Sequence, residues 1–195
     1  MAVYHKNRTE SPAQTARRWI KHGRVIVDTE TTGLGNDAQI VEIAIINLWG
    51  EVLLSTLVKP TIDIPEDATS IHGITNEMVS TAPTWPEVLP KVFELIGDQW
   101  IAYNAPFDMG MIERNSQGLD CSLAGTTALC AMRLYAEFNA EWDANRCQYK
   151  WKKLVEAAEK LNAIPDDSFG LSPHRALYDC YMTLGVVRAI AEGDL

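Results

Sequence analysis

The sequence predicts an α/β domain in which helices pack against a mixed β-sheet. Three segments rich in β-branched residues follow one another near the start of the chain, at 24–30, 39–48 and 51–58. Because the links between them are short, they should form an antiparallel meander rather than a βαβ unit. From about residue 127 onward the pattern is mainly helical. Strands that come first and helices that come later indicate a mixed sheet flanked by helices.

The chain of 195 residues is long enough for one domain with a sizeable core. We expect an amino-terminal helical extension at 1–23 and a main domain at 24–195. The composition is 47% hydrophobic, yet no apolar run reaches membrane-spanning length, and the first residues lack the apolar core of a secretory signal. These features predict a cytoplasmic protein without a membrane contact.

The extension has the pattern of a short helix with defined ends. Ser11 can cap its start, Pro12 suits the first helical position, and Gln14 completes a capping box. Gly23 can end it. Its three basic side chains indicate a helix face that is exposed to solvent. The alternative is that they contact the phosphate backbone of a nucleic acid. They are Arg17, Arg18 and Lys21.

The other elements follow in order along the main domain. The apolar run VIV is typical of a strand covered on both faces, and the isoleucine-rich QIVEIAIINL predicts a second strand. Thr84 and Glu87 can form a capping box for a helix to about residue 96, which Pro90 should disturb, whereas 59–78 should be irregular. The remaining expected elements are a strand at 99–103, a loop running into a helix at 104–115, and helices at 127–138, 150–161 and 174–192.

The cysteines and the net charge narrow the possible functions. No cysteine pair has disulfide or zinc-site spacing, so we expect reduced thiols. The cysteines are Cys121, Cys130, Cys147 and Cys180. A net charge of −9 argues against a polyanionic partner such as nucleic acid. The argument weakens if several acids bind divalent cations, so a nucleic-acid substrate is not excluded.

The segment VDTETTGLGNDA supports two incompatible hypotheses. From Gly33 it matches the G-x-G-x-x-A pattern of a dinucleotide-binding turn. That turn must lead into a helix whose amino terminus faces the pyrophosphate, whereas the residues that follow here favour a strand. We therefore predict that Gly33 and Gly35 form a turn between two strands.

Asp28 and Glu30 in the same segment suit a metal site. Residues i and i+2 of a strand project from one face, so the two carboxylates should lie side by side. Without a cation they would repel each other, and with Mg²⁺ or Mn²⁺ they become hard oxygen ligands. The pair alone could equally lie on a solvent-facing edge. Asp108, His174 and Asp179 lie at expected helix starts and could complete a site.

The spacing of His174 and Asp179 restricts where each can lie. Five helical steps rotate by about 500°, so the two residues cannot share a face of one regular helix. If both serve one site, His174 lies in the loop or first turn and Asp179 lies inside the helix. Ser172 and Pro173 suit a helix start there. A surface histidine at a helix start is the alternative.

Together these residues resemble the DEDDh group of exonucleases, whose name records four acids and a histidine. The matching pieces are VDTETTGL, IHGIT, NAPFD and HRALYD, in the group's order over about 24–190. The tail HRALYDCY is similar to that of exodeoxyribonuclease X, and VDTETTGL and NAPFD are similar to proofreading epsilon subunits of bacterial replicative polymerases. The segment GTTALCAMRLY matches the group's Asp-Thr-Leu element only loosely.

The resemblance implies a ribonuclease H-like fold with a mixed five-stranded sheet. It also implies an enzyme that removes nucleotides from 3′ ends. We expect DNA more than RNA as the substrate, in repair or end trimming. The resemblance further implies that two divalent cations, Mg²⁺ or Mn²⁺, are bound by Asp28, Glu30, Asp108 and Asp179, with His174 as the general base. Two cations can activate a water and stabilise the attacking and leaving oxygens, and histidine accepts protons near neutral pH.

The resemblance also implies residues that contact the terminal nucleotide, with core packing as the alternative for Leu34 and Phe107. They are Thr31, Thr32, Leu34, His72 and Phe107. The basic and aromatic cluster RCQYKWKKL could follow a phosphate backbone while Tyr149 or Trp151 stacks on a base. Its lysines could also serve solubility alone.

Two other functions stay open from the sequence. One is an RNA-trimming exonuclease, which would require a pocket that accepts a 2′-hydroxyl. The other is a proofreading subunit that binds a polymerase, and a homodimer or a repair partner is also possible. An inactive scaffold is disfavoured because all five expected catalytic positions are filled, and a structural Ca²⁺ site because no D-x-[DN]-x-[DN]-G loop occurs.

Overall fold

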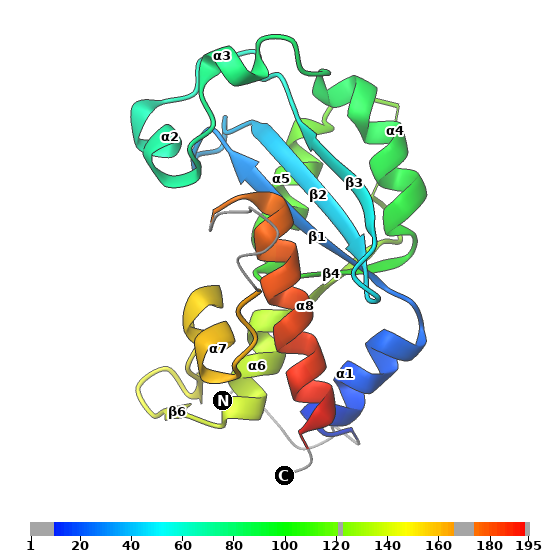
Figure 1. Ribbon diagram of the computed structural model, residues 1–195, viewed down its shortest axis with the longest axis vertical. Helices are drawn as coiled ribbons and strands as arrows, with labels where there is room; N and C mark the ends of the chain where they lie inside the picture. The colour runs from blue at the N-terminus through cyan, green and yellow to red at the C-terminus, as the bar shows by residue number, and fades with distance from the viewer. Residues whose placement is uncertain (1–9, 121–122, 166–173, 194–195) are drawn as a thin grey trace.

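A computed structural model describes residues 10–120, 123–165 and 174–193 (Figure 1). Its helices are α1 Pro12–Lys21, α2 Glu66–His72, α3 Asn76–Val79, α4 Trp85–Ile96, α5 Ala105–Asn115, α6 Ala131–Asn139, α7 Leu154–Lys160 and α8 Ala176–Glu192. Its strands are β1 Val25–Thr31, β2 Ile40–Asn47, β3 Val52–Leu57, β4 Gln99–Ala102, β5 Thr127–Cys130, β6 Trp142–Asp143 and β7 Gln148–Tyr149. Within these residues, no helix is both long and apolar enough to cross a membrane.

One five-stranded sheet, in the order β3-β2-β1-β4-β5, organises the molecule. Strands β1, β2 and β3 pair antiparallel, whereas β4 pairs parallel with both β1 and β5. The predicted meander and the predicted mixed sheet with flanking helices are therefore confirmed. The predicted turn at Gly33 and Gly35 is confirmed as well, because it connects β1 directly to β2.

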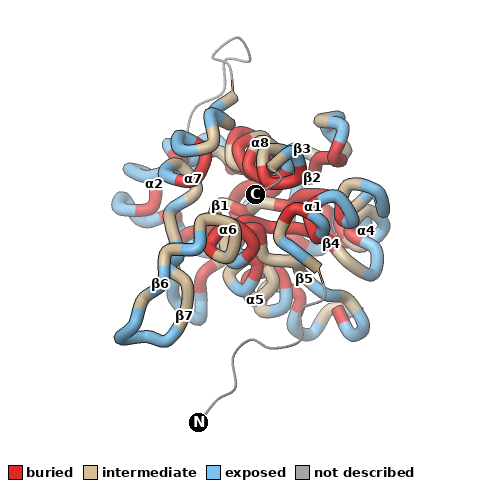
Figure 2. Tube along the Cα trace, turned by 90° about the horizontal axis from the view of Figure 1, so that it is seen from below, coloured by how far each residue is buried: buried red, intermediate tan, exposed pale blue. Residues whose placement is uncertain are grey.

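Helices cover both faces of the sheet (Figure 1). Alternation along β1 directs Ile26 into a core with α1, α6, α7 and α8, and directs Val25 and Val27 into a core with α4 and α5. All eight residues of β2 are buried, which explains why its sequence is an almost unbroken apolar run. Figure 2 shows the buried residues gathered along the sheet and the inward sides of the helices.

Helix α1 belongs to this packing. Its capping box between Ser11 and Gln14 forms as predicted. Trp19 is buried in the core on the α8 side, and the Nε atom of Arg17 donates a hydrogen bond to the carbonyl of Ala191 at 2.8 Å. Arg18 pairs with Glu10. These contacts give Arg17 and Arg18 structural partners. A domain boundary at residue 23 stays a prediction.

Two predictions of secondary structure were wrong. Residues 127–130 form strand β5 and not the start of a helix, because they pair with β4 along its whole length. The stretch 59–78 contains α2 and α3. Helix α4 reaches Ile96 as predicted, and Pro90 inside it removes a hydrogen bond to the carbonyl of Pro86. Both prolines are exposed, so water can bind that carbonyl.

The basic and aromatic cluster also differs from its predicted form. The segment around it makes a hairpin of β6 and β7, and α7 begins only at Leu154. Glu141 binds Lys150 at 2.7 Å and Lys152 at 3.0 Å. The ring of Tyr149 packs edge-on against Trp142, with 5.4 Å between ring centroids. Part of the positive charge of the cluster is therefore compensated within the protein.

Candidate metal centre

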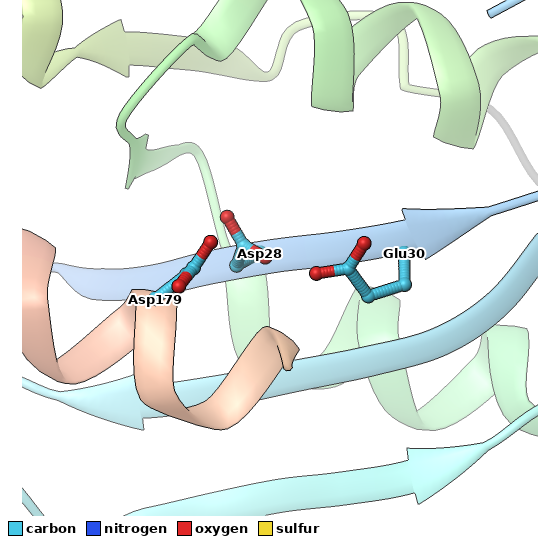
Figure 3. A group of neighbouring side chains, drawn as sticks. All are labelled: Asp28, Glu30 and Asp179. Carbon is cyan, nitrogen blue, oxygen red and sulfur yellow. The ribbon is translucent and has the colours of Figure 1, made fainter. Parts of the chain in front are cut away.

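Three carboxylates converge between β1 and the start of α8. They belong to Asp28, Glu30 and Asp179, and one ligand oxygen from each lies within 4.8 Å of the others. Figure 3 shows the two strand acids side by side, with Asp179 reaching toward them from the first turn of α8. The predicted alternation explains this arrangement, because residues two apart in β1 share the face that α8 covers.

Close packing holds α8 against this face. Cys180 follows Asp179 in the helix and is fully buried. Its Sγ atom lies 3.5 Å from the carbonyl oxygen of Ala44 in β2 and 3.8 Å from that of Ile26 in β1. The predicted reduced thiols agree with the described cysteines Cys130, Cys147 and Cys180, which are all free, whereas Cys121 lies outside the described residues.

Burial and repulsion from nearby acids raise the pKa of every acid in this cluster. Burial, followed by repulsion from Asp179, raises the pKa of Glu30 to about 8. Burial and then the charge of Asp108 raise the pKa of Asp28 well above its usual value. Burial likewise raises the pKa of Asp179 to about 6, against the lowering effect of His174. Each carboxylate would release its proton more readily beside a cation.

The donor set fits a hard divalent cation. The Oδ1 atom of Asp179 is buried and has no hydrogen-bond partner among the described residues. A buried carboxylate oxygen without a partner is energetically costly unless it coordinates a cation or accepts a proton. Carboxylate oxygens are the ligands that Mg²⁺, Mn²⁺ and Ca²⁺ prefer. Asp28, Glu30 and Asp179 are therefore able to hold a divalent cation.

Asp108 flanks the cluster from the other face of β1. It lies in the first turn of α5 and is buried, and it is not a member of the group within 4.8 Å. Its Oδ1 atom accepts a hydrogen bond from the Thr29 hydroxyl at 2.9 Å. Burial is the main cause that raises the pKa of Asp108 to about 7. Besides burial, the charge of Asp108 raises the pKa of Asp28. The carboxylate of Asp108 itself is held by the hydroxyl of Thr29.

His174 lies just before α8, where the spacing argument placed it. Helix α8 begins at Ala176, with Arg175 as its N-cap residue, so Asp179 lies inside the helix and His174 lies outside. His174 is exposed and has a φ of 58°, in the left-handed region. The predicted helix-start residues Ser172 and Pro173 lie outside the described residues.

The predicted substrate residues on the β1 loop lie in different environments. Thr31 and Thr32 are buried. The hydroxyl of Thr31 donates to the carbonyl of Gly33 at 2.7 Å, and that of Thr32 accepts from the amide of Gln39 at 3.0 Å. Leu34 is 84% exposed, so core packing does not explain its apolar side chain.

His72 and Phe107 also differ from each other. His72 is buried, its Nδ1 atom accepts a hydrogen bond from the amide of Ile74 at 3.0 Å, and its Nε2 atom lies 3.3 Å from the carbonyl oxygen of Thr31. Its ring therefore ties α2 to the end of β1. Phe107 is half-buried and packs against the core on the α5 side.

Sequence reasoning missed Glu42 and Arg175. Glu42 lies in β2 directly opposite Glu30 and is buried. Its carboxylate binds the guanidinium of Arg175 and the amide of Ala176. A lone acid inside the apolar run of QIVEIAIINL was the available signal, because a carboxylate is almost never buried without a partner.

A family model described as Exonuclease matches residues 25–187, most of the chain. The chain belongs to the exonuclease family. This exonuclease is 45% identical to the uncharacterized exonuclease CP81 of Escherichia phage 186 over 188 residues, which are 93% of this chain and 94% of that protein. It is 34% identical to exodeoxyribonuclease 10 of Escherichia coli over 166 residues, 83% of this chain and 66% of that protein.

A solved structure agrees with these relatives. The exonuclease resembles exonuclease X, solved in complex with 5′ overhanging duplex DNA, with a TM-score of 0.66 and 29% identity over 85% of this chain and 89% of that one. The predicted exonuclease family and the predicted ribonuclease H-like fold class are therefore confirmed. The protein is an enzyme of the nuclease class of hydrolases.

Proposed function

We propose that this exonuclease removes nucleotides from the 3′ ends of DNA by using Mg²⁺ or Mn²⁺ at the candidate metal centre. The observation that carries the proposal is the convergence of Asp28, Glu30 and Asp179 within 4.8 Å, with a buried Asp179 oxygen that lacks a partner among the described residues. Repulsion among these acids favours cation binding over an empty, fully ionised site.

The side chains divide the work of hydrolysis. Asp28, Glu30 and Asp179 hold cations directly, and Asp108 assists from α5. Divalent cations bound there supply Lewis-acid chemistry and neutralise charge on the phosphodiester. His174 accepts the proton of the attacking water, for which its exposed position beside Asp179 is suitable. Thr31 and Thr32 shape the loop that carries Leu34, and Leu34 and Phe107 contact the terminal nucleotide.

DNA is the favoured substrate because of the relatives. Exodeoxyribonuclease 10 is a deoxyribonuclease by name, and exonuclease X was solved with duplex DNA that has a 5′ overhang. Such a duplex presents a recessed 3′ end, which we propose as a substrate here. A role in DNA repair, a cytoplasmic location, a homodimer and a polymerase partner stay predictions, as does a phosphate contact by the cluster around Tyr149 and Trp151.

Digestion of end-labelled substrates tests the proposal. Wild-type protein should shorten 3′ ends of single-stranded DNA and of recessed duplex DNA with Mg²⁺ or Mn²⁺ and should be inactive with EDTA. Asp28→Asn keeps the size of the side chain but weakens cation binding, so activity should fall by about 10²-fold or more, the scale seen when groups that stabilise transition-state charge are lost.

Asp98→Asn is the matched control. Asp98 is exposed and pairs with Arg24 near the other end of β1, so its loss should leave activity near the wild-type level. Activity that resists EDTA, or equal rates for Asp28→Asn and wild type, would contradict the proposal. Faster cleavage of RNA than of DNA with the same cations would keep the mechanism and reassign the substrate.

A further inference from the structure

We propose that Glu42 and Arg175 form a positioning clamp that sets the place of His174 and of the first turn of α8 relative to β1. The inference rests on the proposed roles of His174 and Asp179, and it concerns two residues that coordinate nothing themselves. The clamp joins the interior strand β2 to Arg175, which connects His174 to α8, and to Ala176, the first residue of α8.

The contacts of Glu42 are directed at a single feature, the start of α8. The Nε atom of Arg175 lies 3.1 Å from Oε1 and 3.0 Å from Oε2, and its Nη2 atom also donates to Oε1. The amide of Ala176 donates to Oε2 at 2.9 Å. Two neighbouring residues of the chain are therefore held by one carboxylate.

Glu42 caps the amino terminus of α8 through the amide of Ala176, although Glu42 itself lies in strand β2. Arg175 gives α8 no side-chain cap, so the first amide of the helix needs an acceptor from elsewhere. A carboxylate at a helix amino terminus also interacts favourably with the helix dipole. Asp179 lies in the first turn of this helix, so the acceptor that fixes the turn also fixes Asp179.

The strand that carries Glu42 is a rigid support. Glu42 lies opposite Glu30 of β1 on one side and opposite Leu57 of β3 on the other. Every residue of β2 is buried. The metal-binding acid Glu30 and the clamping acid Glu42 are therefore opposite each other on one face of the sheet. The contacts of Glu42 therefore fix the distance between β1 and α8 close to the place where the carboxylates of Glu30 and Asp179 come together.

Glu42 is a positioning residue and not a further ligand. It is not part of the group of ligand atoms within 4.8 Å, and both of its oxygens accept hydrogen bonds. In addition to burial, the charge of Glu42 raises the pKa of Asp28, Glu30 and Asp179, and Arg175 opposes this effect at Glu30. His174, one residue before Arg175, is left exposed beside the cluster.

Conservative variants test the clamp without removing a charge. Arg175→Lys keeps the positive charge but cannot bind a carboxylate through two nitrogens, and Glu42→Asp keeps the acid but draws it back by one methylene. Because small misplacements of reacting groups can slow a reaction by about 10²-fold, we expect kcat to fall by about this factor in both variants. KM should change by less than about threefold. The dissociation constant for Mn²⁺, measured by calorimetry, should rise, because Asp179 lies in the turn that the clamp fixes.

Two further measurements separate positioning from general damage. Arg24→Lys is the matched control, because Arg24 is mostly buried and pairs with Asp98 at 2.8 Å away from the site, so its kcat should stay near wild type. In Arg175→Gly, added methylguanidinium should restore part of kcat, whereas the same addition to Arg24→Gly should not raise it.

The outcomes distinguish this inference from the proposed function. Wild-type kcat in both Arg175→Lys and Glu42→Asp, together with an inactive Asp28→Asn, would overturn the clamp alone. Active Asp28→Asn would overturn the proposed function first. A loss of kcat accompanied by a lower melting temperature in both variants, without rescue by methylguanidinium, would show a purely structural role and would also overturn the clamp.

Discussion

At the scale of single residues, Glu30 shows what the acidic cluster does to the protein without metal. Its folded-state pKa of about 8 lies above the ordinary glutamate value of 4.5. The folded protein therefore holds this proton more tightly than the unfolded chain does. The associated stability is complete below about pH 4.5 and is lost as the pH rises through 8.

The metal-free protein should consequently become less stable between pH 5 and 8. In EDTA, the melting temperature of wild type should fall over this range, and Glu30→Gln, which cannot ionise, should melt several degrees higher than wild type at pH 8. Differential scanning calorimetry measures both effects. A wild-type melting temperature that is constant over this range, or a Glu30→Gln protein that melts lower at pH 8, would contradict the account.

The key acids could be placed from sequence because their geometry is local. Alternation along a strand put Asp28 and Glu30 on one face, and the five-residue spacing put His174 before the helix of Asp179. The role of Glu42 could not be predicted in this way. Its partners lie more than a hundred residues further along the chain and depend on how α8 packs on β2.

At the scale of elements, α1 precedes the residues that match the exonuclease family yet packs into the core. Trp19→Ala should lower the free energy of unfolding by about 3–5 kcal/mol, the usual effect of emptying a buried tryptophan site. Trp49→Ala is the control, because Trp49 is 68% exposed and its loss should change stability by less than about 0.5 kcal/mol. Urea unfolding measures both, and equal small effects would mean that α1 is a separable extension.

The elements that sequence reasoning missed are short and depend on distant partners. Strand β5 has four residues and forms only through its pairing with β4, whereas its sequence TALC suits a helix equally well. Helices α2 and α3 lie among prolines in a stretch without a long apolar period. By contrast, α8 and strands β1 and β2 have long patterns that predict them unambiguously.

At the scale of the whole molecule, the site joins the two ends of the family-matching region. Asp28 and Glu30 come from the first strand and Asp179 from the last helix, so the cluster exists only when the sheet and α8 have packed together (Figures 1 and 3). If these three carboxylates bind cations as proposed, cation binding, catalysis and folding are linked through them.

Anomalous diffraction from crystals soaked with Mn²⁺ would show whether Asp28, Glu30 and Asp179 bind a divalent cation. Wild-type crystals should show an anomalous peak between β1 and α8, about 2 Å from carboxylate oxygens of Asp28, Glu30 and Asp179. Asp28→Asn crystals treated alike should show no such peak. Wild-type crystals in which Mn²⁺ appears only elsewhere on the surface, or nowhere, would contradict the proposed cation site.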